Sequence, residues 1–256
     1  MLAKTTLSAA FFGAVALAVA TPGIFWVNSG VIASQKAILP YEQYVKWYEE
    51  IHIRDWMGAK KGAITAAWRY QSLDPESDLP FLVTYKYPDI SEFNAPEFTQ
   101  VSLTHPSLPE GGPITKFAQF EVLIGSHIET WRGASTGDDR GPLLVTESID
   151  SGNVSAEQIN KWYGETYIKD LSGIKGWRRT SRFEGSQQPK WFALHEFEDG
   201  SFGTDVKLPG LLGNSSGTKE IANSVKKADL TLWRLVREYG NATTAWGQQG
   251  GDKIVG

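Results

Sequence analysis

One segment of the chain occurs twice, and this repeat restricts the fold more than any other feature of the sequence. Residues 42–55 read EQYVKWYEEIHIRD and residues 157–170 read EQINKWYGETYIKD, so eight of fourteen positions are identical at an offset of 115. The flanking segments align with small changes of offset, as expected where insertions fall in loops. The repeat therefore predicts two copies of one structural unit.

Each copy shows the hydrophobic pattern of strand, helix, strand, strand, helix and strand. In the first copy the predicted strands cover 24–28, 64–70, 81–87 and 117–124, with helices at 41–56 and 89–99. In the second copy they cover 143–148, 178–183, 191–197 and 230–236, with helices at 156–171 and 219–227. The predicted fold class is α+β, with two tandem ferredoxin-like βαββαβ units.

A βαββαβ unit carries both helices on one face of its sheet and leaves the other face bare. The two units can cover these bare faces by packing against each other, which predicts an intramolecular dimeric α/β barrel and a monomer with an internal pseudo-dimer. Alternation of Ala193 and His195 with Phe192 and Leu194 fits a strand buried on both faces. We expect a hydrophobic ligand pocket between the two sheets.

The composition excludes several classes of protein. The net charge is −4 and no run of basic residues exceeds two, so no nucleic-acid partner is expected. Because there is no cysteine, disulfides, thiolate metal sites and a cysteine nucleophile are excluded. Aromatic residues make up 12% of the chain and include 10 Trp, which suggests an aromatic-lined cavity.

The N-terminus is typical of a secretory signal peptide. Residues 1–20 contain Lys4, an apolar run from Leu7 to Ala20 and the sequence Ala-Val-Ala at 18–20. The apolar run is too short to span a bilayer, so no integral membrane segment is expected. We expect secretion, with a cytoplasmic location as the alternative if this leader is not a signal peptide.

The predicted domain organisation follows from the leader and the repeat. It comprises a signal peptide at 1–20, a first repeat at 21–133, a second repeat at 141–240 and a flexible tail at 241–256.

Three short segments resemble a known group of proteins. The sequences KWYEEIHI at 46–53, FWVN at 25–28 and ALHEF at 193–197 resemble the EthD-like members of the dimeric α/β barrel superfamily, in particular their tandem-repeat fungal proteins. The resemblance covers nearly all of the chain after the leader. It implies an interior cavity for hydrophobic small molecules, as in relatives that include cofactor-independent monooxygenases and polyketide cyclases or dehydratases.

His52 is the first candidate catalytic residue. It matches the histidine that recurs on the first helix of EthD-like sequences, and an imidazole can transfer a proton near neutral pH. The alternative is a structural histidine that packs against the sheet or caps the helix. The second copy has Tyr167 at this position, so only one half of the barrel would carry the base.

His195 is the second candidate, for proton transfer or for hydrogen bonding to the substrate. Its counterpart in the first copy is Tyr85, so each half holds one histidine and one tyrosine at these two positions. We also expect Trp26, Asn28 and Tyr48, together with Tyr85 and Tyr167, to contact the substrate; the alternative for Trp26 is ordinary sheet packing. No metal site is predicted, because His105 and His127 have no acidic or histidine partner at ligand spacing.

The sequence leaves three functions open. The first is a cofactor-independent oxidoreductase, monooxygenase or dehydratase that acts on an aromatic or polyketide-like molecule with a histidine base. The second is a binding protein for a hydrophobic small molecule, without catalysis. The third is a haem-binding barrel, since a single axial histidine could serve; apart from this third alternative, no cofactor is expected. No phosphate-binding or nucleotide-binding motif is present.

Overall fold

The structure is a computed structural model that describes residues 20–199, 216–241 and 252–255. The predicted signal peptide therefore lies outside the described residues, except for Ala20. No helix in these ranges is both long enough and apolar enough to cross a membrane.

The first half of the chain forms four strands and a long interrupted helix. These elements are β1 (Gly23–Val31), a short 3₁₀ turn (Ala33–Gln35), α1 (Tyr41–Trp47), a π-helical turn (Tyr48–His52), α2 (Ile53–Gly58), β2 (Ala66–Ser72), β3 (Phe81–Tyr87), four further 3₁₀ turns (Ile90–Asn94, Pro96–Gln100, Pro109–Gly111 and Ile114–Lys116) and β4 (Ala118–Gly133). The predicted strand at 81–87 is confirmed to the residue.

The second half repeats this order. Its elements are β5 (Leu143–Asp150), α3 (Ala156–Trp162), a π-helical turn (Tyr163–Tyr167), α4 (Ile168–Ser172), β6 (Trp177–Gly185), β7 (Trp191–Phe197), α5 (Ser216–Ser224), β8 (Lys227–Gly240) and the short strand β9 (Lys253–Val255). The predicted strand at 191–197 is also confirmed to the residue. β9 lies within the segment predicted to be a flexible tail and pairs in parallel with β4.

The second helix predicted in each half differs from the prediction. In place of a helix at 89–99, the structure has two 3₁₀ turns, because Pro96 cannot donate the backbone hydrogen bond that a continuous helix needs there. The helix predicted at 219–227 covers 216–224 instead, and residue 227 already begins a strand.

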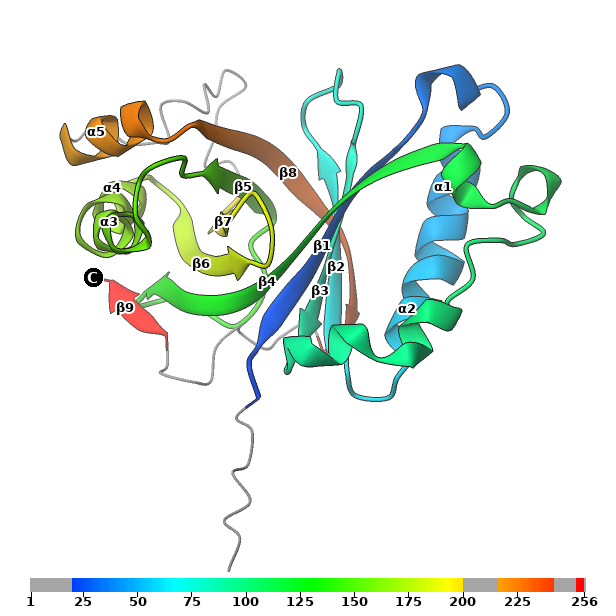
Figure 1. The fold of residues 1–256 in the computed structure, drawn as a ribbon, viewed down its shortest axis with the longest axis horizontal. Helices are drawn as coiled ribbons and strands as arrows, with labels where there is room; N and C mark the ends of the chain where they lie inside the picture. The colour runs from blue at the N-terminus through cyan, green and yellow to red at the C-terminus, as the bar shows by residue number, and fades with distance from the viewer. Residues whose placement is uncertain (1–19, 200–215, 242–251, 256) are drawn as a thin grey trace, which may run out of the picture.

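Eight strands close into one barrel, which confirms the predicted fold class (Figure 1). The order around the barrel is β1-β3-β2-β8-β5-β7-β6-β4, and β4 returns to pair with β1. Every neighbouring pair within this ring is antiparallel. Closure leaves none of the eight strands as a free edge, apart from the strand ends.

The two longest strands join the halves. Residues 118–126 of β4 pair with β1 and residues 125–132 pair with β6, while β8 pairs with β5 through 227–234 and with β2 through 233–240. Both strands are longer than predicted, at 118–133 against 117–124 and at 227–240 against 230–236. The C-terminal extensions pair with the other half, so they are fixed by tertiary contacts rather than by a local pattern.

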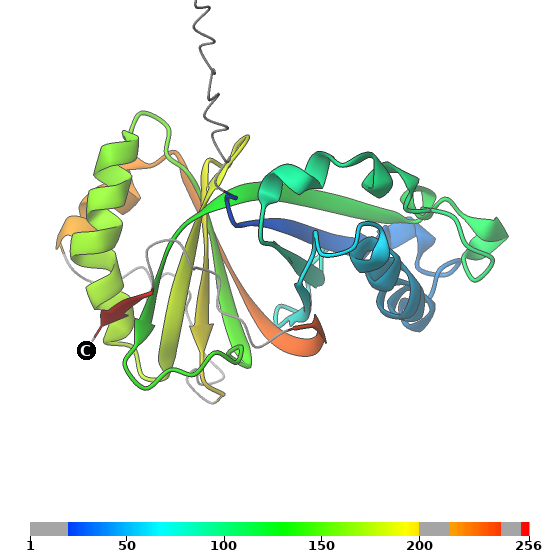
Figure 2. The same ribbon diagram turned by 90° about the horizontal axis from the view of Figure 1, so that it is seen from below.

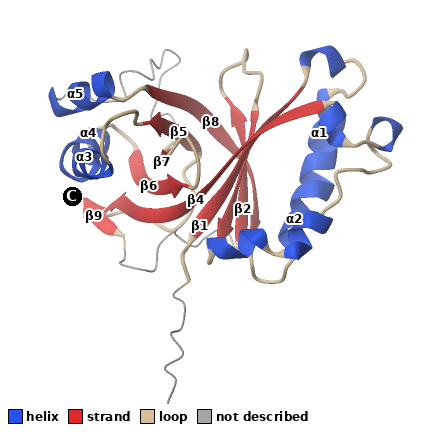
Figure 3. Cartoon of the chain, viewed as in Figure 1, coloured by secondary structure: helices blue, strands red, loops and turns tan. Residues whose placement is uncertain are grey.

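The helices lie on opposite sides of the barrel. The helix formed by α1 and α2 covers the sheet of the first half, and the helix formed by α3 and α4 covers that of the second (Figures 2 and 3). The structure thus has a central barrel with a helix-covered core on each outer face.

Side chains fill the middle of the barrel, where the sequence predicts a hydrophobic pocket between the two sheets. A cavity lined by strands of both halves remains at one end of the barrel. The buried residues of the interior are Ile24, Trp26, Ala66, Trp68, Tyr70, Leu82, Leu144, Phe183, Phe192, Leu194 and Trp233. Large aromatic rings meet across the axis; Trp26, for example, lies edge-on to Phe192 with ring centroids 5.6 Å apart. The bare faces do shield each other, but they do so by close packing.

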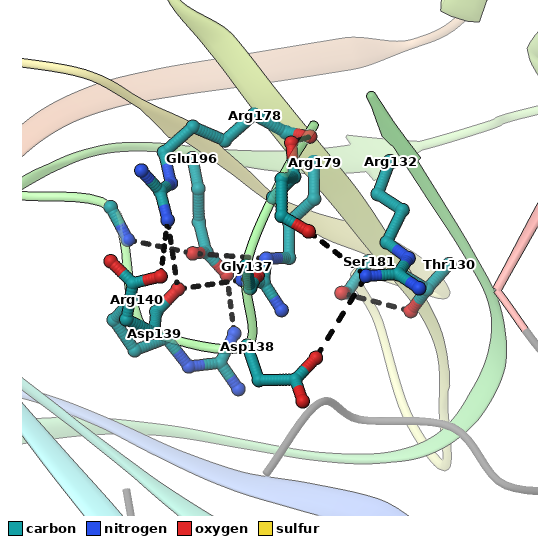
Figure 4. A network of polar contacts seen from close by, with 12 residues as sticks. Thr130, Arg132, Gly137, Asp138, Asp139, Arg140, Arg178, Arg179, Ser181 and Glu196 are labelled. Atoms are coloured by element: carbon teal, nitrogen blue, oxygen red, sulfur yellow. Dashed lines mark hydrogen bonds and ion pairs between the residues drawn. The ribbon is translucent and has the colours of Figure 1, made fainter. Parts of the chain in front are cut away.

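The linker between the halves, residues 134–142, is held at one end of the barrel by a network of polar contacts (Figure 4). Arg140 reaches the Trp68 ring, with its guanidinium carbon 4.0 Å from the ring centroid, and forms a buried ion pair with Glu196. Arg179 pairs with Glu196 at 3.3 Å and donates to the backbone carbonyl oxygens of Gly137 and Asp139 in the linker, at 2.8 Å and 2.6 Å. Burial alone would raise the pKa of Glu196, but the charges of Arg140 and Arg179 hold it below its ordinary value.

A glycine in β4 provides a test of the packed interior. A Cβ atom at Gly125 would collide with the Phe192 ring, whereas one at Gly164 would meet nothing within 4 Å. We expect Gly125→Ala to destabilise the protein by about 1–3 kcal/mol through overpacking. Gly164→Ala is the matched control and should be neutral or slightly stabilising. Urea unfolding measures both, and an unchanged stability for Gly125→Ala would contradict the packed interior.

Candidate functional site

The candidate histidines and tyrosines lie outside the barrel wall, beneath the helices. In β7, Phe192 and Leu194 point into the barrel, so Ala193 and His195 point toward α3 and α4. The same alternation places Tyr85 of β3 beneath the helix of the first half. The sequence correctly predicts that successive side chains of these strands point to opposite faces. It does not show which of the two faces lies inside the barrel.

His195 is the centre of a buried polar cluster in the second half. Its Nδ1 atom lies 3.0 Å from Thr180 Oγ1, and its Nε2 atom lies 3.5 Å from Glu147 Oε2. The Tyr163 hydroxyl donates a hydrogen bond to Glu147 Oε2. His195, Glu147 and Thr180 have no exposed surface, and Tyr163 has almost none.

The hydrogen bonds fix the tautomer that fits this cluster. Trp177 Nε1 donates to Thr180 Oγ1 at 3.0 Å, so the Thr180 hydroxyl has its own proton left for Nδ1 of His195. In the neutral tautomer that fits this arrangement, the imidazole proton lies on Nε2, which faces Glu147. We assign this tautomer from the hydrogen-bond network.

Tyr167 completes the cluster. Its ring stacks on Trp162 with centroids 4.4 Å apart and meets the His195 ring edge-on at 5.8 Å. Burial, followed by the charge of Glu147, raises the pKa of the Tyr167 hydroxyl well above its ordinary value. Tyr167 therefore stays protonated and can donate a hydrogen bond.

Local structure brings the two tyrosines to this place. Ser155 begins α3 with a capping box, in which its hydroxyl accepts from the Gln158 backbone and the Gln158 side chain accepts from the Ser155 backbone. The π-helical turn at 163–167 then begins and ends with the two tyrosines. The first half has a π-helical turn at the equivalent place, 48–52, and such turns are frequent at functional sites.

Three polar atoms of the cluster have no hydrogen bond of normal geometry among the described residues. They are Oε1 of Glu147, Nε2 of His195, which lies 3.5 Å from Glu147 Oε2, and the hydroxyl of Tyr167, which faces Glu147. Buried polar groups are almost always paired, because an unpaired one costs about 1–3 kcal/mol. The convergence of three such atoms in one apolar core makes this cluster the candidate site.

A buried arginine places positive charge beside the cluster. The Arg182 guanidinium carbon lies 3.8 Å from the centroid of the Tyr163 ring, and the side chain bonds to Glu129 and Asn160, each at 3.0 Å. Burial lowers the pKa of Arg182 to about 10, so the side chain remains charged at neutral pH. Strand pairing places Arg69 at the equivalent position of the first half, where it pairs with Glu49 at 3.0 Å.

The first half brings His52, Tyr48 and Tyr85 into one aromatic core. His52 stacks on Trp47 with ring centroids 4.8 Å apart and lies 5.4 Å from the Tyr48 ring. Burial lowers the pKa of His52 to about 4, although Asp55 partly offsets this shift. His52 is therefore neutral at pH 7. Because its pKa is so low, its ring is a weaker base than efficient proton transfer at neutral pH requires. Its catalytic role stays a prediction.

Trp26 and Asn28 lie in a third place, at the open end of the barrel opposite the linker. Trp26 Nε1 donates to Asn28 Oδ1 at 2.9 Å, and both residues line a cavity there. The predicted substrate-contacting residues are thus divided among three separate sites: His195 with Tyr167, His52 with Tyr48 and Tyr85, and Trp26 with Asn28.

Sequence reasoning did not assign a role to Glu147, Thr180 or Arg182. The signal for Glu147 is a carboxylate in the middle of an otherwise apolar strand, LLVTESI at 143–149. Arg182 could have been found from the repeat, because the equivalent residue of the first half, Arg69, is also an arginine within a buried strand.

The described residues do not fit a haem. His195 is enclosed by Thr180, Glu147 and Tyr167, and His52 is stacked between aromatic rings. No histidine lines the cavity at Trp26 and Asn28, or the cavity between Asp89 and Glu184. Within residues 20–199, 216–241 and 252–255, no group of three metal-binding side chains gathers.

Comparison with known proteins gives the fold class. No protein-family model matches the sequence, and no curated protein matches it. Among solved structures, the chain is similar to an anthrone oxidase-like protein, with a TM-score of 0.58 at 9% identity over 88% of this chain and 96% of the other.

Two further structures show the same architecture. One is a mutant chlorite dismutase from Candidatus Nitrospira defluvii in complex with cyanide, with a TM-score of 0.54 at 8% identity over 84% of this chain and 91% of the other. The second is a proposed monooxygenase from Fusobacterium nucleatum, with a TM-score of 0.51 at 10% identity over 87% and 95%. The chain therefore has the fold of the dimeric α/β barrels, with both halves in one polypeptide.

The two partly buried histidines His52 and His127 predict a loss of stability in acid. Burial, followed for His127 by the charge of Lys86, lowers each pKa to about 4, whereas an unfolded histidine titrates near about 6.5. Between these values the unfolded state binds more protons, so stability falls as the pH falls, by roughly 1.4 kcal/mol per pH unit for each histidine.

His127→Asn removes one of these contributions. Between pH 7 and pH 5 the free energy of unfolding of the wild type should fall by about 2 kcal/mol more than that of this variant. Urea unfolding of both proteins at the two pH values measures the difference. Equal losses would show that His127 is not held neutral in the fold.

Proposed function

We propose that the protein is an oxidoreductase that needs no bound cofactor and acts on an aromatic small molecule with an acidic C–H or O–H group. The observation that carries this proposal is the buried pair of Glu147 and His195, in which Glu147 Oε1 and His195 Nε2 have no hydrogen-bond partner among the described residues. The fold likeness to an anthrone oxidase-like protein and to a proposed monooxygenase supports the choice of reaction class.

In this proposal the pair of Glu147 and His195 takes up the substrate proton. Oε1 of Glu147 accepts it, because Oε2 already accepts from Tyr163 and faces the Nε2 proton of His195. The Nε2–H group of His195 holds the carboxylate in place, while Thr180 fixes the imidazole. The Tyr167 hydroxyl donates to the negative oxygen that develops on the substrate anion.

The anion then reacts with molecular oxygen. For anthrone as a trial substrate, the CH₂ carbon becomes a carbonyl group: one molecule of anthrone and one of oxygen give one of anthraquinone and one of water. The substrate loses four electrons, and oxygen gains four. The apolar core around the pair suits this step because it excludes water from a reactive anion.

Substrate entry requires the covering elements to move. The cluster lies beneath α3, α4 and α5, and Thr218 of α5 donates to Asp170 and accepts from Trp162. These bonds hold α5 over the helix that carries Tyr163 and Tyr167. Access to the pair therefore depends on separation of α5 from that helix.

The test is oxygen uptake and anthraquinone formation with anthrone, compared with a protein-free blank. The wild type should exceed the blank, and Glu147→Gln should lower the rate by about 10²–10⁴-fold, because it removes the proton acceptor and preserves the side-chain shape. His195→Gln should also reduce the rate.

The matched control is His127→Asn, which changes a histidine inside the barrel and outside the cluster. It should keep the wild-type rate. Turnover by Glu147→Gln at the wild-type rate would refute the assigned role. Wild-type protein that retains aromatic ligands but oxidises none of them would favour the non-catalytic binding alternative.

A further inference from the structure

Arg182 of β6 and Glu147 of β5 lie in one row across the sheet, beneath the helices of the second half. Strand pairing places Arg182 opposite Ala193 of β7, and Ala193 opposite Glu147. The three side chains therefore point to the same face of the sheet. Arg182 and Glu147 are 1% and 0% exposed, and the side chain between them is only a methyl group, which leaves room for the two long side chains to approach each other.

The equivalent row of the first half has no carboxylate. There Arg69 of β2 pairs with Val83 of β3, and Val83 pairs with Val27 of β1. Arg69 takes its acidic partner from the helix, where Glu49 lies 3.0 Å away. The repeat aligns Glu49 with Gly164, so the helix of the second half supplies no carboxylate at that place. The buried arginine is thus common to both halves, but its acidic partners in the second half come from the strands.

Tyr163 connects Arg182 with Glu147. The Arg182 guanidinium carbon lies 3.8 Å from the centroid of the Tyr163 ring, and the Tyr163 hydroxyl donates a hydrogen bond to Glu147 Oε2. Burial lowers the pKa of Arg182, and the charges of Glu129 and Glu147 partly offset this shift. A positive charge in an apolar core favours the ionised form of a nearby carboxyl group.

The other groups around Glu147 are neutral in this arrangement. They are His195 of β7 in its neutral tautomer, Tyr163 and Tyr167 of the helix, and Leu230 of β8. An ionised carboxylate without exposed surface needs a compensating charge, because burial strongly disfavours the charged form. Among the groups described around Glu147, Arg182 is the one that supplies it.

Glu129 of β4 does not use up the charge of Arg182. It pairs with Arg182 at 3.0 Å, but it also forms an ion pair with Lys253 of β9. Positive and negative charges therefore alternate from the exposed Lys253 through Glu129 and Arg182 to the buried Glu147.

We propose that Arg182 is a positioning residue that keeps Glu147 ionised and so able to accept the substrate proton. This inference rests on the proposed function, in which Oε1 of Glu147 is the proton acceptor. Arg182 acts through Glu147 and Tyr163 and does not touch the substrate. A Glu147 that already carries a proton could still accept from Tyr163, but it could not take up a second proton.

Infrared spectroscopy tests the charge of Glu147 without turnover, because a protonated carboxyl group has a carbonyl stretch that a carboxylate lacks. The difference between the spectra of the wild type and Glu147→Gln at pH 7 should contain no protonated carboxyl band. This band should appear in Arg182→Met and be absent from the double variant Arg182→Met, Glu147→Gln. Arg182→Lys keeps the positive charge and should not show the band.

The matched control is Arg69→Met, which removes the equivalent buried arginine of the first half. It should leave Glu147 ionised, because Val27 lies where Glu147 lies in the second half, and Glu49 keeps Arg237 at 3.1 Å. A protonated Glu147 in the wild type, or an Arg182→Met spectrum without the band, would overturn the proposal. The wild-type spectrum decides even where Arg182→Met does not fold.

Turnover separates this inference from the proposed function. With anthrone and oxygen, Arg182→Met should lower the rate at pH 7 by about 10–100-fold and recover as the pH rises, because a protonated Glu147 ionises again at higher pH. Arg182→Lys should stay within about five-fold of the wild type. A pH profile of Arg182→Met identical to that of the wild type would overturn the positioning role. The predicted spectra in a wild type that does not oxidise anthrone would support the charge arrangement and refute the proposed reaction.

Discussion

The structure depends on mutual shielding of two apolar sheet faces. Each half contributes four strands whose inner face carries large side chains such as Trp26, Phe192 and Trp233, and neither half covers this face with its own helices. β4 and β8 make the shielding possible, because each pairs with strands of both halves and so closes the sheet into a barrel. Each fully buried aromatic side chain contributes about 1.5–3 kcal/mol, so closure stabilises the two halves together.

Packing of the interior determines where polar chemistry can occur. The centre of the barrel is occupied by aromatic and aliphatic side chains, so polar groups gather at its two ends and beneath the helices. At one end Arg140 and Arg179 neutralise Glu196, and at the other end carboxylates surround a cavity. Beneath α3 and α4, Glu147 and His195 form the pair with incompletely satisfied polar atoms. The two halves share the same order of strands and helices, but the first half lacks the equivalent of this pair, because Val27 occupies the position of Glu147 there.

The repeat in the sequence was sufficient to predict the fold class, because a constant offset of 115 places the same helix and strands in both halves. It could not predict the full lengths of β4 and β8, whose C-terminal extensions pair with the opposite half. Alternation in 191–197 predicted that His195 and Phe192 point to opposite faces, but it did not show that His195 faces the helices. The cluster around His195 was only partly foreseen, because Glu147 and Thr180 reach it from two other strands and Tyr163 from the helix.

The central claim is that the two halves form one cooperative barrel. Native-state hydrogen exchange followed by peptide mass spectrometry tests it directly, because the slowest amides report the free energy of global unfolding. The account predicts that β1 and β3 in the first half and β5 and β7 in the second half exchange with the same free energy and the same dependence on denaturant. Loss of protection in one half at a lower denaturant concentration, while the other half remains protected, would contradict it.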